Sequence, residues 1–250
     1  MFVEYQKKKD YGVIYLNRPE KRNAISKEMA AMLGTILDKA KKEEIKFLVL
    51  TSKDNKMFCA GGDLTYLHGN LSREEAYARL NPMKEILYKI ALFPVPVIAL
   101  LNGNALGGGC ELATACDIRI ARKNTKFGFI QANLGILPGW GGGTLLYHKV
   151  SSSFALEWLT EARVMDCHLL EKKGWINRVV NEHEIDDMDV LLKDYISKSY
   201  RQMRLLKDQH IKSWTNRNLF FEMTEEVKKT AMLWDSEEHK HAVEKFLLRK

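Results

Sequence analysis

The chain has 250 residues, 46% of them hydrophobic and 28% charged, and carries a net charge of +7 with a pI near 9.1. These values are those of an ordinary globular protein, long enough to bury a substantial core in one large domain or two small ones. No run of about 18 apolar residues occurs, so we expect no membrane span. The first residues lack the apolar segment of a signal peptide, so we expect a cytoplasmic protein.

The cysteines and the net charge limit which kinds of site and partner we expect. Four cysteines show neither the paired spacing of a metal site nor the density of a disulfide scaffold, so we expect reduced thiols near the core: Cys59, Cys110, Cys116 and Cys167. The positive charge suits an anionic partner, such as a phosphorylated cofactor, nucleic acid or an acidic surface. Because the basic residues are spread along the chain, a solvated basic surface is the simpler explanation.

The N-terminal part predicts a hairpin, a helix and a buried strand. Residues 2–6 and 12–17 have the pattern of two strands joined by a polar turn, which is typical of a β-hairpin. A basic, polar loop follows at 17–23. Ser26 can cap a helix whose apolar residues recur at three- and four-residue steps as far as Ala40. Residues 47–51 are apolar throughout and predict a buried strand.

The next segment combines a glycine-containing loop with a second helix. Residues 58–64 follow a strand and hold Gly61 and Gly62, which favours a loop with exposed backbone N–H groups. Ser72 and Glu75 form a capping box for a helix that runs to about Leu92. Residues 95–101 form a continuous apolar strand.

Residues 106–117 hold three consecutive glycines, Gly107 to Gly109, and then an apolar segment that contains Glu111. Glycine costs about 1 kcal/mol relative to alanine inside a helix, so the triplet predicts a helix start at which a ligand approaches bare backbone. The free N–H groups of a first helical turn suit a negative oxygen. Gly108 and Glu111 are three residues apart and share one helix face, so a backbone donor and a carboxyl point toward one volume. Close packing of the helix on a strand is the alternative explanation.

The remainder of the chain is expected to be mostly helical. Residues 118–121 predict a strand, and residues 134–144 form a third glycine-rich loop that lacks the signature of a P-loop or a dinucleotide site. Helices are expected at 153–162 and 166–173, followed by a strand at 175–180. Three amphipathic helices then follow, at 185–207, 219–234 and 237–249.

Four motifs, in this order and spacing, resemble those of the enoyl-CoA hydratase/isomerase, or crotonase, superfamily. They are residues 16–19 with 23–24, residues 58–64, residues 102–103 with 107–112 and 116–117, and residues 134–139 with 141–142. The resemblance implies an α/β fold, a spiral of strand-strand-helix units at 1–185, and a helical oligomerisation region at 186–250 within the same structural domain. It also implies acyl-CoA substrates and assembly into a homotrimer or a dimer of trimers, with no membrane or nucleic-acid partner expected.

The resemblance also implies which residues form the site. The thioester oxygen would lie between the backbone N–H groups of Gly62 and Gly108, with Glu111 as general acid or base. Substrate binding would fall to Lys21, Arg22, Ala24, Ala60, Gly61, Asp63, Leu64, Gly107, Leu134, Pro138 and Gly139. No metal or separate cofactor is implied, because coenzyme A enters as part of the thioester.

One position departs from the family pattern. The hydratases use a second glutamate where this chain has Gln131, and no Asp or Glu occurs between Asp117 and Glu157. An amide orients a water or substrate but cannot relay a proton. The leading hypothesis is therefore a hydratase-type lyase in which Glu111 transfers the proton and Gln131 orients. The alternatives are an acyl-CoA decarboxylase or isomerase, and a non-catalytic protein that binds acyl-CoA or RNA.

Three further side chains near these motifs have two readings each. Trp140 would narrow the pocket, or it is a core aromatic residue. Tyr66 and His68 follow the Gly62 loop and would supply a second polar group, or they belong to the surface.

Overall fold

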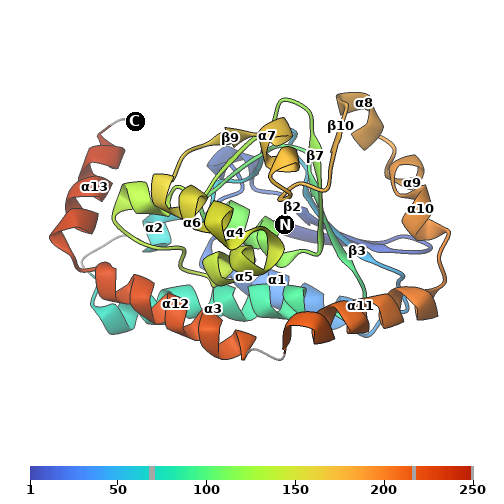
Figure 1. Cartoon of the computed structure of the whole chain (residues 1–250), viewed down its shortest axis with the longest axis horizontal. Helices are drawn as coiled ribbons and strands as arrows, with labels where there is room; N and C mark the ends of the chain where they lie inside the picture. Colours follow the sequence, from blue (N-terminus) through green and yellow to red (C-terminus); the bar gives the residue numbers. More distant parts are fainter. Residues whose placement is uncertain (68–70, 216–217, 249–250) are drawn as a thin grey trace.

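Two β-sheets flanked by helices form the computed structural model, which describes residues 1–67, 71–215 and 218–248 (Figure 1). The larger sheet has the order β1-β2-β3-β5-β7-β10. Its strands are β1 (Val3–Lys7), β2 (Gly12–Leu16), β3 (Leu48–Ser52), β5 (Val97–Leu101), β7 (Ile118–Arg122) and β10 (Arg178–Val180). The β1–β2 pair is antiparallel and the other pairs are parallel, so the predicted hairpin is confirmed. Every residue of β3 and β5 is buried, as continuous apolar runs in a parallel sheet require.

The smaller sheet has the order β4-β6-β8-β9 and is made of very short strands. These are β4 (Met57–Cys59), β6 (Asn104–Leu106), β8 (Lys126–Gly128) and β9 (Met165–Asp166). Three of them follow β3, β5 and β7 in sequence, and a helix follows each, which gives the repeated strand-strand-helix units that the resemblance implies. The expectation of a plain loop at 58–64 was wrong in its first residues, because Phe58 and Cys59 belong to β4.

Helices cover both sheets, and two of them, α1 and α3, begin at the predicted caps. They are η1 (Pro19–Lys21), α1 (Lys27–Ala40), α2 (Leu64–Leu67), α3 (Arg73–Ala91), α4 (Gly108–Ala115), η2 (Gln131–Leu134), α5 (Gly142–Lys149), α6 (Ser152–Glu161) and α7 (Cys167–Lys172). Ser26 Oγ accepts a hydrogen bond from the Met29 N–H at 3.3 Å. Ser72 and Glu75 form the reciprocal capping box at the start of α3. Both predicted caps are confirmed.

The expected helix at 185–207 is wrong, because the chain breaks there into short pieces. The C-terminal helices are α8 (Glu182–Ile185), α9 (Met188–Leu191), α10 (Lys193–Ile196), α11 (Tyr200–Thr215), α12 (Leu219–Leu233) and α13 (Glu237–Leu247). Asp187 accepts hydrogen bonds from the N–H groups of Asp189 and Val190 at 3.1 Å and so starts a new helix. Such side chains compete with the helix backbone for its donors. Within the described residues, no helix is long and apolar enough to span a bilayer.

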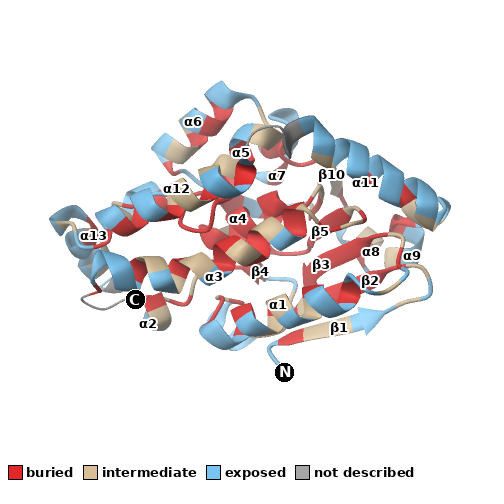
Figure 2. Cartoon of the chain, turned by 90° about the horizontal axis from the view of Figure 1, so that it is seen from below, coloured by how far each residue is buried: buried red, intermediate tan, exposed pale blue. Residues whose placement is uncertain are grey.

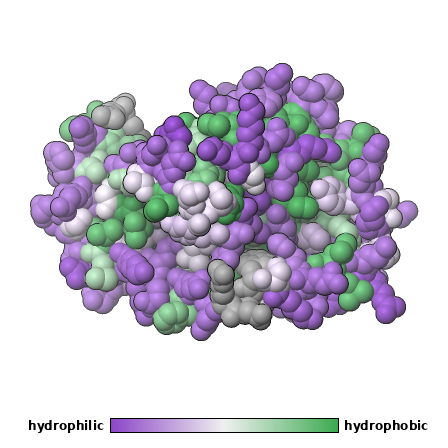
Figure 3. Space-filling view, viewed as in Figure 1, coloured by the Kyte–Doolittle hydropathy of each residue, from purple (hydrophilic) through white to green (hydrophobic). Residues whose placement is uncertain are grey.

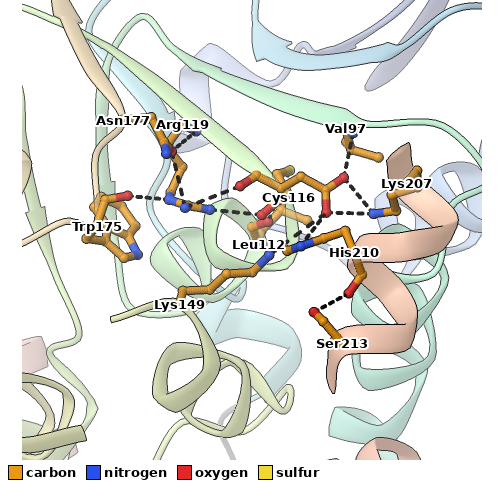
Figure 4. A network of polar contacts seen from close by, with 11 residues as sticks. Val97, Leu112, Cys116, Arg119, Lys149, Trp175, Asn177, Lys207, His210 and Ser213 are labelled. Atoms are coloured by element: carbon orange, nitrogen blue, oxygen red, sulfur yellow. Dashed lines mark hydrogen bonds and ion pairs between the residues drawn. The ribbon is translucent and has the colours of Figure 1, made fainter. Parts of the chain in front are cut away.

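A buried charge cluster fastens α11 to the large sheet (Figure 4). Asp117, which precedes β7, accepts the Val97 N–H at 2.8 Å and Lys207 Nζ at 2.6 Å on both carboxylate oxygens. Lys149 and His210 approach the same carboxylate at 3.9 and 3.6 Å. Burial lowers the pKa of Lys149 to about 8. A charge buried in this way needs its partner nearby, so the cluster specifies where α11 docks.

Helix α4 lies at the centre of the molecule and all its residues are buried (Figure 2). A Cβ added to Gly109 would lie only 2.1 Å from the carbonyl oxygen of Cys59, so glycine is what lets α4 touch the end of β4. Glycine at position 109 therefore holds α4 in register with the smaller sheet.

The four cysteines are buried free thiols, as the sequence predicts.

We expect Gly109→Ala to lower the free energy of unfolding by about 3 kcal/mol, because the added methyl group overlaps backbone that cannot move aside. Gly34 is the matched control: it lies inside α1 with nothing within 4 Å of an added Cβ, so Gly34→Ala is expected to add about 1 kcal/mol. Urea unfolding of both variants measures whether each substitution lowers or raises the free energy of unfolding. Equal effects would contradict the close contact between α4 and β4.

Candidate active site

A cavity of about 350 Å³ lies where the three glycine-containing loops meet. Every site residue predicted from the sequence except one lines it: Lys21, Arg22, Ala24, Ala60, Gly61, Gly62, Asp63, Leu64, Gly107, Gly108, Glu111, Gln131, Leu134 and Gly139. The exception is Pro138, whose carbonyl oxygen accepts a hydrogen bond from Thr230 Oγ1 at 2.7 Å. Segments far apart in the sequence thus form one site.

Two backbone N–H groups in this cavity have no acceptor within the described part of the chain. They belong to Gly62, beside β4, and to Gly108, the first residue of α4. The loops that carry them touch, since a Cβ on Gly61 would lie 3.1 Å from the Gly108 nitrogen. Gly61 has a φ of +100°, a conformation that side chains disfavour. Two such donors in one cavity suit a single anionic oxygen.

Glu111 is buried in the same cavity, and both oxygens of its carboxylate accept hydrogen bonds. Oε1 accepts from Gln131 Nε2 at 2.9 Å and from the Gly139 N–H at 3.2 Å. Oε2 accepts from the N–H groups of Trp140 and Gly142 at 2.8 and 3.0 Å. Burial raises the pKa of Glu111, and these four hydrogen bonds oppose the rise. A buried carboxyl at this position is a candidate for taking and returning a proton.

Gln131 lies at the start of η2 and contacts Glu111 through its amide nitrogen. A carboxylate only accepts hydrogen bonds, which assigns the nitrogen rather than the oxygen to that contact. Its amide oxygen is buried and has no hydrogen-bond partner within the described residues. An unpaired buried acceptor is costly, so this oxygen is a site for a donor on a ligand or water.

The sequence analysis missed a second, partly buried carboxyl group near Glu111. Glu226, on α12, accepts the Gly143 N–H at 3.1 Å and Thr144 Oγ1 at 2.7 Å, together with the Thr144 N–H. The first turn of α5 and the loop before it thus give donors to both carboxyls. Burial and the charge of Glu111 raise the pKa of Glu226 to about 8. The sequence does contain a signal for this residue: Glu226 lies next to Val227 and three residues after Met223, which are apolar positions of the predicted helix.

The remaining predicted residues separate into the rim of the cavity and its support. Lys21 and Arg22 are exposed and line the rim, where their charges can meet an anionic group. Asp63 also lines the cavity, but its carboxylate pairs with Arg18 at 2.6 Å and so holds the loop. Tyr66 lies outside this cavity, on a neighbouring one, and His68 falls outside the described residues. Within those residues, no His, Cys, Asp and Glu cluster is arranged to hold a metal ion.

Comparisons with known proteins identify the family and the fold of the chain. Residues 6–250 match the family model described as enoyl-CoA hydratase/isomerase. The chain is 34% identical over 188 residues to methylglutaconyl-CoA hydratase of Mus musculus, covering 74% of this chain and only 60% of that protein. It is 34% identical over 204 residues to crotonyl-CoA hydratase of Syntrophomonas wolfei, covering 81% and 78%. The crystal structure of enoyl-CoA hydratase from Bacillus halodurans superposes with a TM-score of 0.88 over 98% of this chain and 100% of that one, at 22% identity, and shares the fold.

We expect Glu226→Gln to change how stability depends on pH. The folded chain keeps the Glu226 proton up to a pH of about 8, whereas an ordinary glutamate in the unfolded chain loses it near 4.5. The unfolded state therefore binds fewer protons between these values, and the wild type loses stability as pH rises. Glutamine cannot ionise, so the variant should gain more than about 1 kcal/mol relative to the wild type between pH 5 and 9.

Urea unfolding at several pH values measures this difference, with the exposed Glu44→Gln as the matched control. The control should follow the wild-type curve. A Glu226→Gln curve parallel to the wild type would show that the carboxyl ionises in the folded chain as it does in the unfolded one.

Proposed function

Because the chain belongs to the enoyl-CoA hydratase/isomerase family, we propose that it is a hydratase-type lyase that adds water to a short-chain enoyl-CoA. The observation that carries this proposal is one cavity holding two unpaired backbone N–H groups and a buried carboxyl, those of Gly62, Gly108 and Glu111. The names of the relatives support hydration of an enoyl-CoA. Crotonyl-CoA, which one of these names contains, carries a short acyl group.

The chemistry begins at the thioester carbonyl. Its oxygen accepts hydrogen bonds from Gly62 and Gly108, and these donors stabilise the negative charge that forms when water adds to the β-carbon. A preset pair of donors in a water-poor site is effective because it needs no reorganisation, and losing one costs about 3–4 kcal/mol in comparable sites. The electron pair of the carbon–carbon double bond thus moves onto the thioester oxygen as an enolate.

Glu111 handles the proton in both halves of the reaction. Its carboxylate takes a proton from the attacking water as the carbon–oxygen bond forms, and the resulting acid returns a proton to the α-carbon of the enolate. The product is a 3-hydroxyacyl-CoA, with one water consumed and no net change at Glu111. Gln131 holds the water, because its unpaired amide oxygen accepts the hydrogen that is not transferred.

The walls of the cavity bind the rest of the thioester. Lys21 and Arg22, at the rim, would meet the phosphates of coenzyme A. Contacts to the acyl and pantetheine parts would come from Ala24, Ala60, Gly61, Leu64, Gly107, Leu134 and Gly139. Asp63 contributes through Arg18, with which it pairs, and Pro138 through its hydrogen bond to α12.

A second candidate is decarboxylation of a malonyl-type thioester, and the amide at position 131 favours it. Loss of carbon dioxide breaks a carbon–carbon bond and leaves the same enolate on Gly62 and Gly108. Only one proton donor is then needed, and Glu111 with its raised pKa supplies it. Mass distinguishes the two products, because hydration adds a water to the substrate and decarboxylation removes carbon dioxide from it.

We also propose that the chain assembles as a homotrimer or a dimer of trimers. The face shown in Figure 3 is largely hydrophilic with separate apolar patches. Large apolar side chains remain exposed on the C-terminal helices, among them Leu205 and Leu206 on α11 and Phe221 and Met232 on α12. Light scattering of the purified protein gives its mass, and a monomer would contradict this assembly.

We expect Glu111→Gln to lower kcat on crotonyl-CoA at least about 100-fold, because glutamine fills the space but transfers no proton. Glu44→Gln, at an exposed position, is the control and should keep wild-type turnover. Mass spectrometry of the products from crotonyl-CoA and methylmalonyl-CoA decides which reaction occurs. Full turnover by Glu111→Gln would remove Glu111 from the mechanism.

A further inference from the structure

A second cavity, of about 770 Å³, lies behind the candidate active site between α1, α2 and α3. Apolar side chains form much of its lining, among them Ile25, Ala30, Met83 and Ile86. Charged residues, including Lys27 and Lys89, lie elsewhere on its lining. The space therefore suits an aliphatic chain better than a polar ligand.

The two cavities share a wall. Thr65, Leu67 and Trp140 line both of them, and the Trp140 side chain is the largest of the three. Trp140 is only 3% exposed, and its backbone N–H holds Glu111 at 2.8 Å. The indole is thus fixed between the site and the second cavity by the same turn that binds the carboxyl.

The indole also packs against the two glycines proposed to bind the thioester oxygen. Its Cζ3 atom lies 2.3 Å from where a Cβ on Gly108 would be, and its Cζ2 atom lies 3.3 Å from that point on Gly62. An acyl chain whose carbonyl oxygen lies on these N–H groups therefore begins beside the indole. Further carbons can enter the second cavity only if the wall moves or is removed.

We propose that Trp140 limits the length of the acyl chain by separating the active site from an apolar cavity that would otherwise accept longer chains. This inference rests on the proposed function, since it assumes that the thioester oxygen binds at Gly62 and Gly108. The substrate class follows: acyl groups of about four carbons fit, and chains of eight or more do not.

The test compares the wild type with Trp140→Ala and Trp140→Phe on enoyl-CoAs of four and eight carbons. A single misplaced methylene in an apolar pocket changes kcat/KM by about 10-fold or more. The wild type should therefore prefer the four-carbon substrate at least about 10-fold, and Trp140→Ala should reduce that preference by about 10-fold, chiefly by lowering KM for the longer chain. Trp140→Phe keeps an aromatic wall and should retain the wild-type preference.

Tyr147→Ala is the matched control, because Tyr147 is an exposed aromatic residue on α5 that lines neither cavity. It should leave the ratio between the two chain lengths unchanged. Equal use of both chain lengths by the wild type, or an unchanged ratio in Trp140→Ala, would overturn the proposal.

Binding of saturated acyl-CoAs separates this inference from the proposed function. Butanoyl-CoA and octanoyl-CoA have no double bond, so calorimetry measures their affinity whether or not the protein is a hydratase. The wild type should bind butanoyl-CoA more tightly, and Trp140→Ala should bind octanoyl-CoA at least as tightly. If the wild type binds neither butanoyl-CoA nor octanoyl-CoA, the proposed acyl-CoA site is refuted. If the wild type binds octanoyl-CoA more tightly than butanoyl-CoA, only the proposed role of Trp140 is refuted. If Trp140→Ala does not fold, Leu67→Ala removes another part of the same wall and must show the same shift.

Discussion

The structure depends on how the buried carboxylate of Glu111 is solvated. A carboxylate removed from water needs several hydrogen bonds to replace its hydration, and here three backbone N–H groups and one amide provide them. Those N–H groups belong to the turn that starts α5, so α4 and α5 must dock together. The same turn gives its next two N–H groups to Glu226 on α12, so the C-terminal helix joins the arrangement. The hydrogen bonds around the proposed catalytic carboxyl therefore also hold these helices together.

Glycine makes this arrangement possible by removing side chains from crowded points. A Cβ on Gly142 would lie 2.3 Å from Cβ of Glu111, so only glycine can donate from that position. Because the donors on both sides of the site are backbone groups, they carry no information about the acyl chain. Under the proposed function, selectivity among thioesters must come from the side chains around them, and Trp140 and Leu67 pack directly against Gly108 and Gly62.

The parts of the fold predicted from the sequence are those that local chemistry determines. Ser26 and Ser72 predict helix starts from the sequence, because each cap lies three residues before the backbone N–H that it binds. Gly108 and Glu111 could be paired in advance because a helix places residues three apart on one face. Family motifs extended this to Gly62 and Gln131, and all four line one cavity.

The parts that were missed depend on contacts between distant segments. Glu226 reaches the site only through the packing of α12 on α3 and α5, which no local pattern encodes. The strands of the smaller sheet, of two or three residues each, are too short to show alternation. The break at Asp187 arises because a side chain takes over backbone donors within a stretch that is otherwise amphipathic.

The backbone donors of Glu111 come from residues 139–142, after the carboxylate in the chain, and Glu226 comes much later. During synthesis on the ribosome, α4 is therefore translated before the groups that solvate its acid exist. A nascent chain that ends before Gly142 must keep Glu111 protonated or hold α4 away from its final position. The hydrogen bonds of this carboxylate can therefore be completed only after the chain has been made past Gly142, and those of Glu226 only near the end of synthesis.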